Sequence, residues 1–132
     1  ASIGIETCAY GPLTEKGGKF YAWPNDYSTV VIPKERVYNL ERDFRGHHNY
    51  EAFTNEQIGS LEILLDFLIP KYGIKIQGSF DYTWFDYNER VIANTAPGIW
   101  SHTTVRKDKF DLYPDSRVLD MLNRLAAKYH RP

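Results

Sequence analysis

The strongest periodic pattern of hydrophobic and polar positions predicts an amphipathic helix that begins at Thr54. Thr54 and Gln57 have the spacing of a capping box, in which each side chain binds the backbone N–H of the other residue. Pro70 and Gly73 mark the expected end of this helix. Its apolar face is broad enough to require burial against a sheet, and it consists of Ile58, Leu61, Leu64, Leu65, Leu68 and Ile69.

A second amphipathic helix is predicted near the end of the chain. Pro114 and Asp115 are typical of a helix start. The apolar positions that follow recur at helical spacing, and they are Val118, Leu119, Leu122, Leu125 and Tyr129. Charged and amide side chains occupy the opposite face. The pattern therefore predicts a helix that packs on one side and faces solvent on the other.

The first residues alternate in a way that predicts a β-strand. Over residues 2–7, the side chains of Ile3, Ile5 and Thr7 would face the core. Glu6 would then lie on the other face of the strand, where its carboxylate could serve a site. The alternative is an ordinary exposed glutamate.

Turn-forming residues divide the following region into short segments. Strands are predicted there at residues 19–23, 27–32 and 37–40. Aromatic and polar residues alternate in part from residue 80 to residue 87, which favours either a hairpin beside the candidate site or aromatic side chains that pack under the loop. Two helices, combined with several strands that are too mixed in character for an all-parallel sheet, indicate an α/β or α+β sandwich.

Composition limits the classes of partner. A length of 132 residues allows one domain with a modest core. The net charge of -1 gives no electrostatic argument for binding nucleic acid or an anionic membrane. Aromatic residues make up 15% of the chain, which suits sugar or peptide binding but equally suits an aromatic-rich core. The longest apolar run, residues 63–69, contains Asp66 and is too short to span a bilayer.

Candidate chemistry is concentrated in the stretch from His102 to Asp111. Residues 103–105 are β-branched and predict the end of a strand, and charged loop residues follow them. The imidazole and the carboxylate are nine positions apart, so they can meet only if the loop folds back. A histidine and a carboxylate are two of the ligand types that catalytic zinc accepts, and Lys109 would lie beside them. The simpler interpretation is a hydrogen bond within the loop.

These residues resemble a known family motif. His102, Lys109 and Asp111, followed by an amphipathic helix, are similar to the C-terminal zinc-site motif of the type 2 N-acetylmuramoyl-L-alanine amidases. These are peptidoglycan amidases of bacteria and phages, related in fold to peptidoglycan recognition proteins. Residues 2–6 resemble the central strand of that family, and residues 53–58 resemble the start of its following helix. The three motifs occur in the family's order.

The resemblance implies a fold and a site. The fold would be α/β, with a mixed central β-sheet packed by helices and incomplete at the N-terminus. Residues 1–132 would be the C-terminal portion of a single amidase catalytic domain. His102, Asp111 and a His upstream of Ala1 would hold Zn²⁺. Glu6 would help to activate water, and Lys109 would stabilise the oxyanion.

The same resemblance implies the substrate and the place of action. The enzyme would hydrolyse the amide bond between the lactyl group of N-acetylmuramic acid and L-alanine of the stem peptide. Its partners would be the peptidoglycan stem peptide, muramic acid and the remainder of its own catalytic domain. It would act at the bacterial cell wall or periplasm, as a phage-encoded endolysin or a virion-associated enzyme.

Two alternatives stay open. A cysteine hydrolase would use Cys8 as nucleophile with His102 and Asp111, although Gly11 and Pro12 follow the cysteine where a helix N-terminus would lower its pKa. A non-catalytic peptidoglycan-binding or virion structural module would keep the fold without turnover. Such a binder needs neither the glutamate near the N-terminus nor the lysine of the loop. Because Cys8 is the only cysteine, an internal disulfide and a four-cysteine zinc site are excluded.

Overall fold

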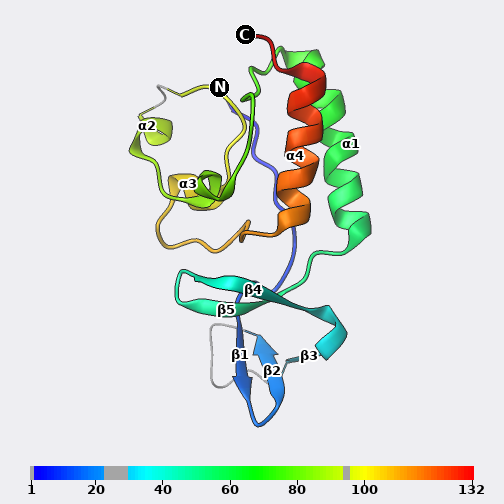
Figure 1. Ribbon diagram of the computed structural model, residues 1–132, viewed down its shortest axis with the longest axis vertical. Coiled ribbons are helices and arrows are strands. Elements are labelled where there is room, and N and C mark those ends of the chain that lie inside the picture. The colour runs from blue at the N-terminus through cyan, green and yellow to red at the C-terminus, as the bar shows by residue number, and fades with distance from the viewer. Residues whose placement is uncertain (1, 23–29, 94–95) are drawn as a thin grey trace. The chain divides into compact units, whose positions relative to one another are not determined.

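A computed structural model describes residues 2–22, 30–93 and 96–132 of the chain (Figure 1). The polypeptide forms two units, Ala1–Phe53 and Thr54–Pro132. The five described strands belong to the first unit, and the two long helices belong to the second. The chain therefore combines helices with small antiparallel sheets, which confirms the α/β prediction at this general level. That both units belong to one amidase domain stays a prediction.

The first sheet of the Ala1–Phe53 unit has three antiparallel strands. β1 (Leu13–Lys16) and β2 (Lys19–Ala22) form a hairpin, and β3 (Val31–Ile32) pairs with β2. Gly17 and Gly18 connect the hairpin with φ of 59° and 77°, the left-handed conformation that this kind of two-residue turn requires. The buried core of this sheet consists of Leu13, Phe20 and Ile32, with Val37 packed against it.

The second sheet of this unit is the antiparallel pair of β4 (Val37–Phe44) and β5 (His47–Glu51). A short 3₁₀ helix, η1 (Lys34–Arg36), precedes β4. Tyr50 of β5 is fully buried, and its hydroxyl donates a hydrogen bond of 2.6 Å to the carbonyl oxygen of Phe44. Because a buried phenol requires such a partner, this bond compensates the burial of the hydroxyl.

Residues 2–10 are irregular, so the strand predicted at the start of the chain is wrong. Ile3 and Ile5, which we expected in the core, are 52% and 40% exposed. A strand needs a neighbouring backbone to pair its N–H and C=O groups, and no described strand pairs with this segment. The segment is held at Tyr10, whose N–H donates to the buried Glu51 carboxylate at 3.0 Å.

The other strand predictions for this unit are confirmed where the structure describes them. The strand predicted at residues 37–40 is the first half of β4, and residues 19–22 form β2 as expected. The strand predicted at 27–32 overlaps β3, while residues 23–29 lie outside the described residues. We did not predict β5, because its sequence is mainly polar and Tyr50 is its one large apolar side chain.

The first helix of the Thr54–Pro132 unit is α1 (Asn55–Tyr72), as predicted. Both capping-box bonds are present: the Thr54 hydroxyl accepts from the backbone N–H of Gln57 at 3.0 Å, and the side-chain oxygen Oε1 of Gln57 accepts from the backbone N–H of Thr54 at 2.8 Å. The helix includes Pro70 in its last turn and ends at Gly73, which has φ of 61°. The glycine, and not the proline, therefore ends α1.

The second long helix, α4 (Ser116–Tyr129), lies beside α1 and runs in the same direction (Figure 1). Its N-cap is the buried Asp115, whose side chain accepts from the Arg117 N–H at 2.8 Å. Side-chain hydrogen bonds join the two helices, and three of the pairs are 62 positions apart, which is the constant offset of parallel helices in register. These pairs are Asn55–Arg117, Glu62–Arg124 and Asp66–Lys128, and Tyr129 also donates to Asp66.

The apolar face of α1 is only partly buried. Its buried residues are Ile58, Leu65 and Ile69, whereas Leu64, which we expected in the core, is 39% exposed. We predicted that α1 packs against a sheet. Within Thr54–Pro132 no strand is described, and α1 packs against α4 instead. Among the described helices, none combines the length and the apolar composition needed to cross a membrane.

In the described residues, short helices connect α1 to α4, so the hairpin does not form. The alternative, in which the aromatic side chains pack in the interior, agrees with the burial of Trp84 and Phe85. The Asp81 and Asn88 side chains each accept a hydrogen bond, of 2.9 Å and 3.0 Å, from the N–H two positions later. Such local bonds start helical turns, and they override the alternating pattern. The short helices are η2 (Tyr82–Phe85), α2 (Glu89–Ile92) and α3 (His102–Val105).

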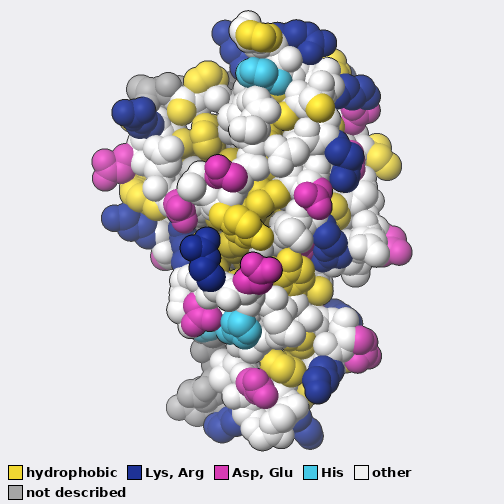
Figure 2. Space-filling model, viewed as in Figure 1, with side chains coloured by type: hydrophobic (Ala, Val, Ile, Leu, Met, Phe, Trp, Pro, Cys, Tyr) yellow, Lys and Arg dark blue, Asp and Glu magenta, His cyan; other side chains and the backbone are white. Residues whose placement is uncertain are grey.

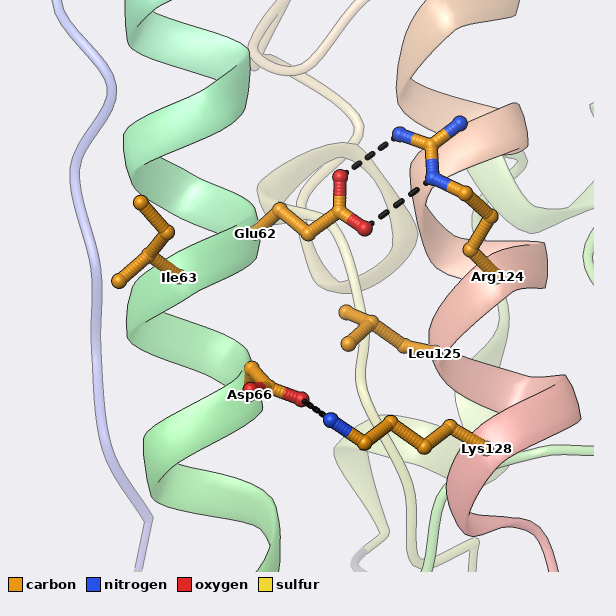
Figure 3. Close-up of a pocket in the computed structure, with 6 residues that line it drawn as sticks. All are labelled: Glu62, Ile63, Asp66, Arg124, Leu125 and Lys128. Carbon is orange, nitrogen blue, oxygen red and sulfur yellow. Dashed lines mark hydrogen bonds and ion pairs between the residues drawn. The ribbon is translucent and has the colours of Figure 1, made fainter.

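Charged side chains of both signs are distributed over the molecular surface. Figure 2 shows Lys and Arg interspersed with Asp and Glu on the visible face, in keeping with the net charge of -1. In Figure 3, ion pairs from α4 to α1 border a cavity of about 340 Å³. Arg124 lies 2.7 Å from Glu62, and Lys128 lies 2.7 Å from Asp66, while Leu125 lines the cavity between the two pairs.

We predict that the pairing of α1 with α4 weakens in acid. The hydrogen bond from Arg124 holds the pKa of Glu62 below its ordinary value of 4.5, so the stabilisation is present above that value and is lost as the pH falls through the folded-state pKa. Glu62→Gln should lower the free energy of unfolding at pH 7 by about 0.5 kcal/mol, and it should flatten the pH dependence below about pH 4.5. Urea unfolding at pH 7 and pH 3 measures both effects.

The control for this prediction is Glu41→Gln, which changes an exposed carboxylate of β4. It should leave the acid dependence close to that of the wild type. Equal pH profiles for wild type and Glu62→Gln would contradict a stabilising role for the Glu62–Arg124 pair.

Candidate functional site

The structure brings His102 and Asp111 together. His102 is the first residue of α3, and Asp111 lies in the segment that follows this helix. The distance from His102 Nδ1 to Asp111 Oδ2 is 3.2 Å. The two side chains are 36% and 47% exposed, so the pair is accessible from solvent. The loop therefore folds back, as the spacing of the two residues required.

Ser101 joins the two ends of this loop. Its hydroxyl oxygen accepts hydrogen bonds from the Leu112 N–H at 3.0 Å and from the Thr103 N–H at 3.3 Å. Positions 101 and 112 directly flank positions 102 and 111. The serine is only 4% exposed, so these bonds are protected from water. The bond that closes the loop therefore also brings the imidazole close to the carboxylate.

Thr104 fixes α3 to the neighbouring helices. Its side chain is buried, and its hydroxyl donates to the carbonyl oxygen of Trp84 at 2.7 Å. Its own carbonyl oxygen accepts from the Asn88 N–H at 2.8 Å. Residues 103–105 are helical and not strand-like as predicted, because the Ser101 cap and these contacts outweigh the β preference of branched side chains.

The segment that leads into α3 is held by a buried tryptophan and a glutamine. The indole N–H of Trp84 donates to the carbonyl oxygen of Ile99 at 2.7 Å. The Gln77 amide both donates to this carbonyl oxygen at 2.7 Å and accepts from the Ile99 N–H at 2.9 Å. Gly98 has φ of 145°, and a Cβ there would lie 2.5 Å from the glutamine oxygen. A side chain at this φ would be strained and would also contact the Gln77 side chain, so the position favours glycine.

The loop between the two site residues carries alternating charges. Arg106 binds Asp108 through two hydrogen bonds of 2.8 Å and 2.7 Å, and this pairing holds the pKa of the aspartate below its usual range. Lys107 places its ammonium 4.7 Å from the centre of the Tyr87 ring. Lys109 is partly buried two positions before Asp111, and its assignment to the oxyanion stays a prediction.

The His102–Asp111 distance fits the separation of two zinc ligands. With Zn–N and Zn–O bonds of about 2.1 Å and a tetrahedral angle, the ligand atoms lie about 3.4 Å apart. The observed 3.2 Å is close to this value. Over residues 2–22, 30–93 and 96–132, no group of three or more His, Cys, Asp or Glu is placed to hold a metal ion. The same distance is also that of a hydrogen bond within the loop, so the assignment of His102 and Asp111 as zinc ligands stays a prediction.

Glu6 and Cys8 lie in the Ala1–Phe53 unit, on the irregular N-terminal segment. Both residues are exposed. The strand predicted at residues 2–7 is not formed, so the alternation that would direct Glu6 toward a site no longer supports its assignment. Their assignments, to water activation and to nucleophilic catalysis, stay predictions.

The residues that position the pair were missed in the sequence. Ser101 and Thr104 have the spacing of a capping box, but the usual motif has Glu or Gln in the last position. A search for a serine three residues before any hydroxyl-bearing residue would have found the helix start. The bond to Leu112 has no local sequence signal, because it joins positions that are 11 residues apart.

Comparisons with protein-family models, with curated proteins and with solved structures found no match to this chain. The resemblance to the amidases therefore has only the motifs to support it. The 3.2 Å contact between His102 and Asp111 is a property of the structure and does not depend on that resemblance.

We predict that Thr104→Val loosens the site. The substitution keeps the shape of the side chain but leaves the buried Trp84 carbonyl oxygen without its hydroxyl donor. The expected loss is about 1 to 3 kcal/mol in the free energy of unfolding, measured by urea denaturation. Thr83→Val is the matched control, because the Thr83 hydroxyl binds Asp81 at an exposed position. Equal stability of the wild type and Thr104→Val would contradict this role for Thr104.

Proposed function

We propose that the chain carries part of the active site of a zinc-dependent N-acetylmuramoyl-L-alanine amidase, with His102 and Asp111 as two metal ligands. The observation that carries the proposal is the 3.2 Å separation of His102 Nδ1 and Asp111 Oδ2 on a solvent-accessible loop. The motif resemblance adds the family and the substrate. The amidase-like arrangement of a mixed central sheet covered by helices belongs to the same proposal.

The third ligand in this proposal is a histidine outside residues 1–132, upstream of Ala1. Zinc in a catalytic site has three protein ligands and one position for water or substrate, and the His102–Asp111 pair supplies two ligands. Residues 1–132 alone should therefore bind zinc weakly. The remainder of the catalytic domain is the partner that the site requires.

Amide hydrolysis requires a nucleophile, stabilisation of the oxyanion and a proton for the leaving amine. Bound zinc, held by His102 and Asp111, would supply an activated water and polarise the carbonyl group. Lys109 would donate a hydrogen bond from its ammonium to the carbonyl oxygen as this oxygen gains negative charge. The oxygen of water would bond to the lactyl carbonyl carbon, the C–N bond would break, and both protons of that water would pass to the nitrogen of L-alanine, which leaves as an ammonium group. In this proposal the groups next to the developing oxyanion, Lys109 and the metal ion, are both positively charged, because the transition state carries negative charge.

We predict that the full-length protein releases L-alanine amino groups from purified peptidoglycan in a chelator-sensitive reaction. Zinc should restore the activity, and alkylation of Cys8 should leave it unchanged. His102→Ala and Asp111→Ala should each lose both bound zinc and activity. Lys109→Ala should keep zinc but lower kcat by about 10² to 10³-fold, as expected for the loss of an oxyanion donor. Lys107→Ala, on the same loop, is the control.

The other outcomes of this assay support different functions. Activity that survives the chelator and is lost on alkylation would establish the cysteine hydrolase and reject zinc. Binding of stem peptide without hydrolysis, in wild type and in Lys109→Ala alike, would establish a non-catalytic binding or virion structural module. Both readouts use the same preparation, so the three functions are compared directly.

A further inference from the structure

A single buried oxygen connects the backbone on both sides of the candidate metal pair. Ser101 Oγ accepts from the Leu112 N–H at 3.0 Å and from the Thr103 N–H at 3.3 Å. The Ser101 and Thr103 hydroxyls also bind each other at 2.9 Å, which orients the serine oxygen. The serine is 4% exposed and the threonine is fully buried. Water is therefore poorly placed to substitute for the serine oxygen.

Ser101 directly precedes His102, and Leu112, to which Ser101 bonds, directly follows Asp111, so the serine oxygen affects the geometry of the pair. The bond to Thr103 fixes the start of α3 and hence the direction in which the His102 side chain leaves the backbone. The bond to Leu112 fixes the peptide unit that follows Asp111. Because the imidazole and the carboxylate lie one position inside these two anchors, the bonds at the anchors determine whether the side chains meet.

Ser101 is itself held from outside the loop. Its N–H donates to the Thr104 hydroxyl oxygen at 3.2 Å, and that hydroxyl donates to the Trp84 carbonyl oxygen at 2.7 Å. Trp84 is buried and is fixed through its indole N–H to Ile99. The oxygen that closes the loop is therefore tied to the interior of the Thr54–Pro132 unit.

We propose that Ser101 is a positioning residue, whose buried hydroxyl sets the separation of His102 Nδ1 and Asp111 Oδ2. As far as this role concerns metal binding, it rests on the proposed function. Residues that orient metal ligands affect affinity strongly, and their loss typically weakens metal binding 10- to 100-fold. The role is distinct from helix capping, which glycine also satisfies.

The test uses Ser101→Gly in the full-length protein. Glycine is an adequate N-cap, so it largely preserves the start of the helix, but it removes the oxygen that binds Leu112. The Zn²⁺ dissociation constant, measured by competition with a chromophoric chelator, should rise at least about 10-fold. Ser101→Ala should do the same with a larger loss of stability, and Ser101→Thr, which keeps the hydroxyl, should recover most of the affinity.

The matched control is Thr54→Ala, which removes the capping box of α1. This variant should lose stability to urea but keep the zinc affinity of the wild type within about 2-fold. If Thr54→Ala and Ser101→Ala weaken zinc binding equally at equal loss of stability, Ser101 acts only as a cap and the proposal is overturned.

A measurement without metal separates this proposal from the proposed function. In the wild type, Nδ1 of His102 should carry the proton that binds Asp111, and long-range ¹H–¹⁵N NMR of the imidazole reports this tautomer. Ser101→Gly should shift the ring toward the Nε2–H tautomer. An unchanged tautomer in Ser101→Gly overturns the positioning role. A wild type that shows the expected tautomer but binds no zinc refutes the proposed function and leaves the positioning role supported.

Discussion

The hydrogen bond from the Leu112 N–H to Ser101 Oγ is the constraint on which the candidate site depends. Without loop closure, nine positions of chain would hold His102 and Asp111 far apart, and no choice of side chains would let them meet. Closing a loop costs conformational entropy, and a bond of 3.0 Å to an oxygen that is screened from water offsets part of this cost. The short distance between the imidazole and the carboxylate is a consequence of the backbone, and not of attraction between the side chains alone.

The surroundings of this bond are polar and fully paired. Among the described residues, every buried side-chain nitrogen or oxygen has a hydrogen-bond partner. The Trp84 and Gln77 side chains hold the backbone at Ile99, which leads into α3, and the Thr104 hydroxyl holds α3 to the carbonyl oxygen of Trp84. Such networks define one backbone arrangement, because a partly satisfied alternative would leave buried groups without partners. The backbone around His102 and Asp111 is therefore held in one conformation, although part of it is irregular.

The pairing of an imidazole nitrogen with a carboxylate oxygen has two chemical uses. In the structure the two atoms lie 3.2 Å apart, which is hydrogen-bonding distance. In the proposed zinc site the same atoms would bind the cation in their deprotonated form. Under that proposal, a proton and the metal would compete for His102 and Asp111. The charges of Arg106 and Asp108 cancel within the loop, and Lys107 and Lys109 are its other charged residues.

The sequence by itself determined the two long helices, most of the strands in the first half and the three side chains of the candidate motif. Helical periodicity and capping residues act over a few positions, so Thr54 and Asp115 specify their helices locally. Only the tertiary structure decided that residues 2–7 form no strand and that residues 103–105 are helical, because strand pairing and the Ser101 bond to Leu112 join distant positions. The motif marks which side chains can act, while contacts between distant positions decide which of them meet.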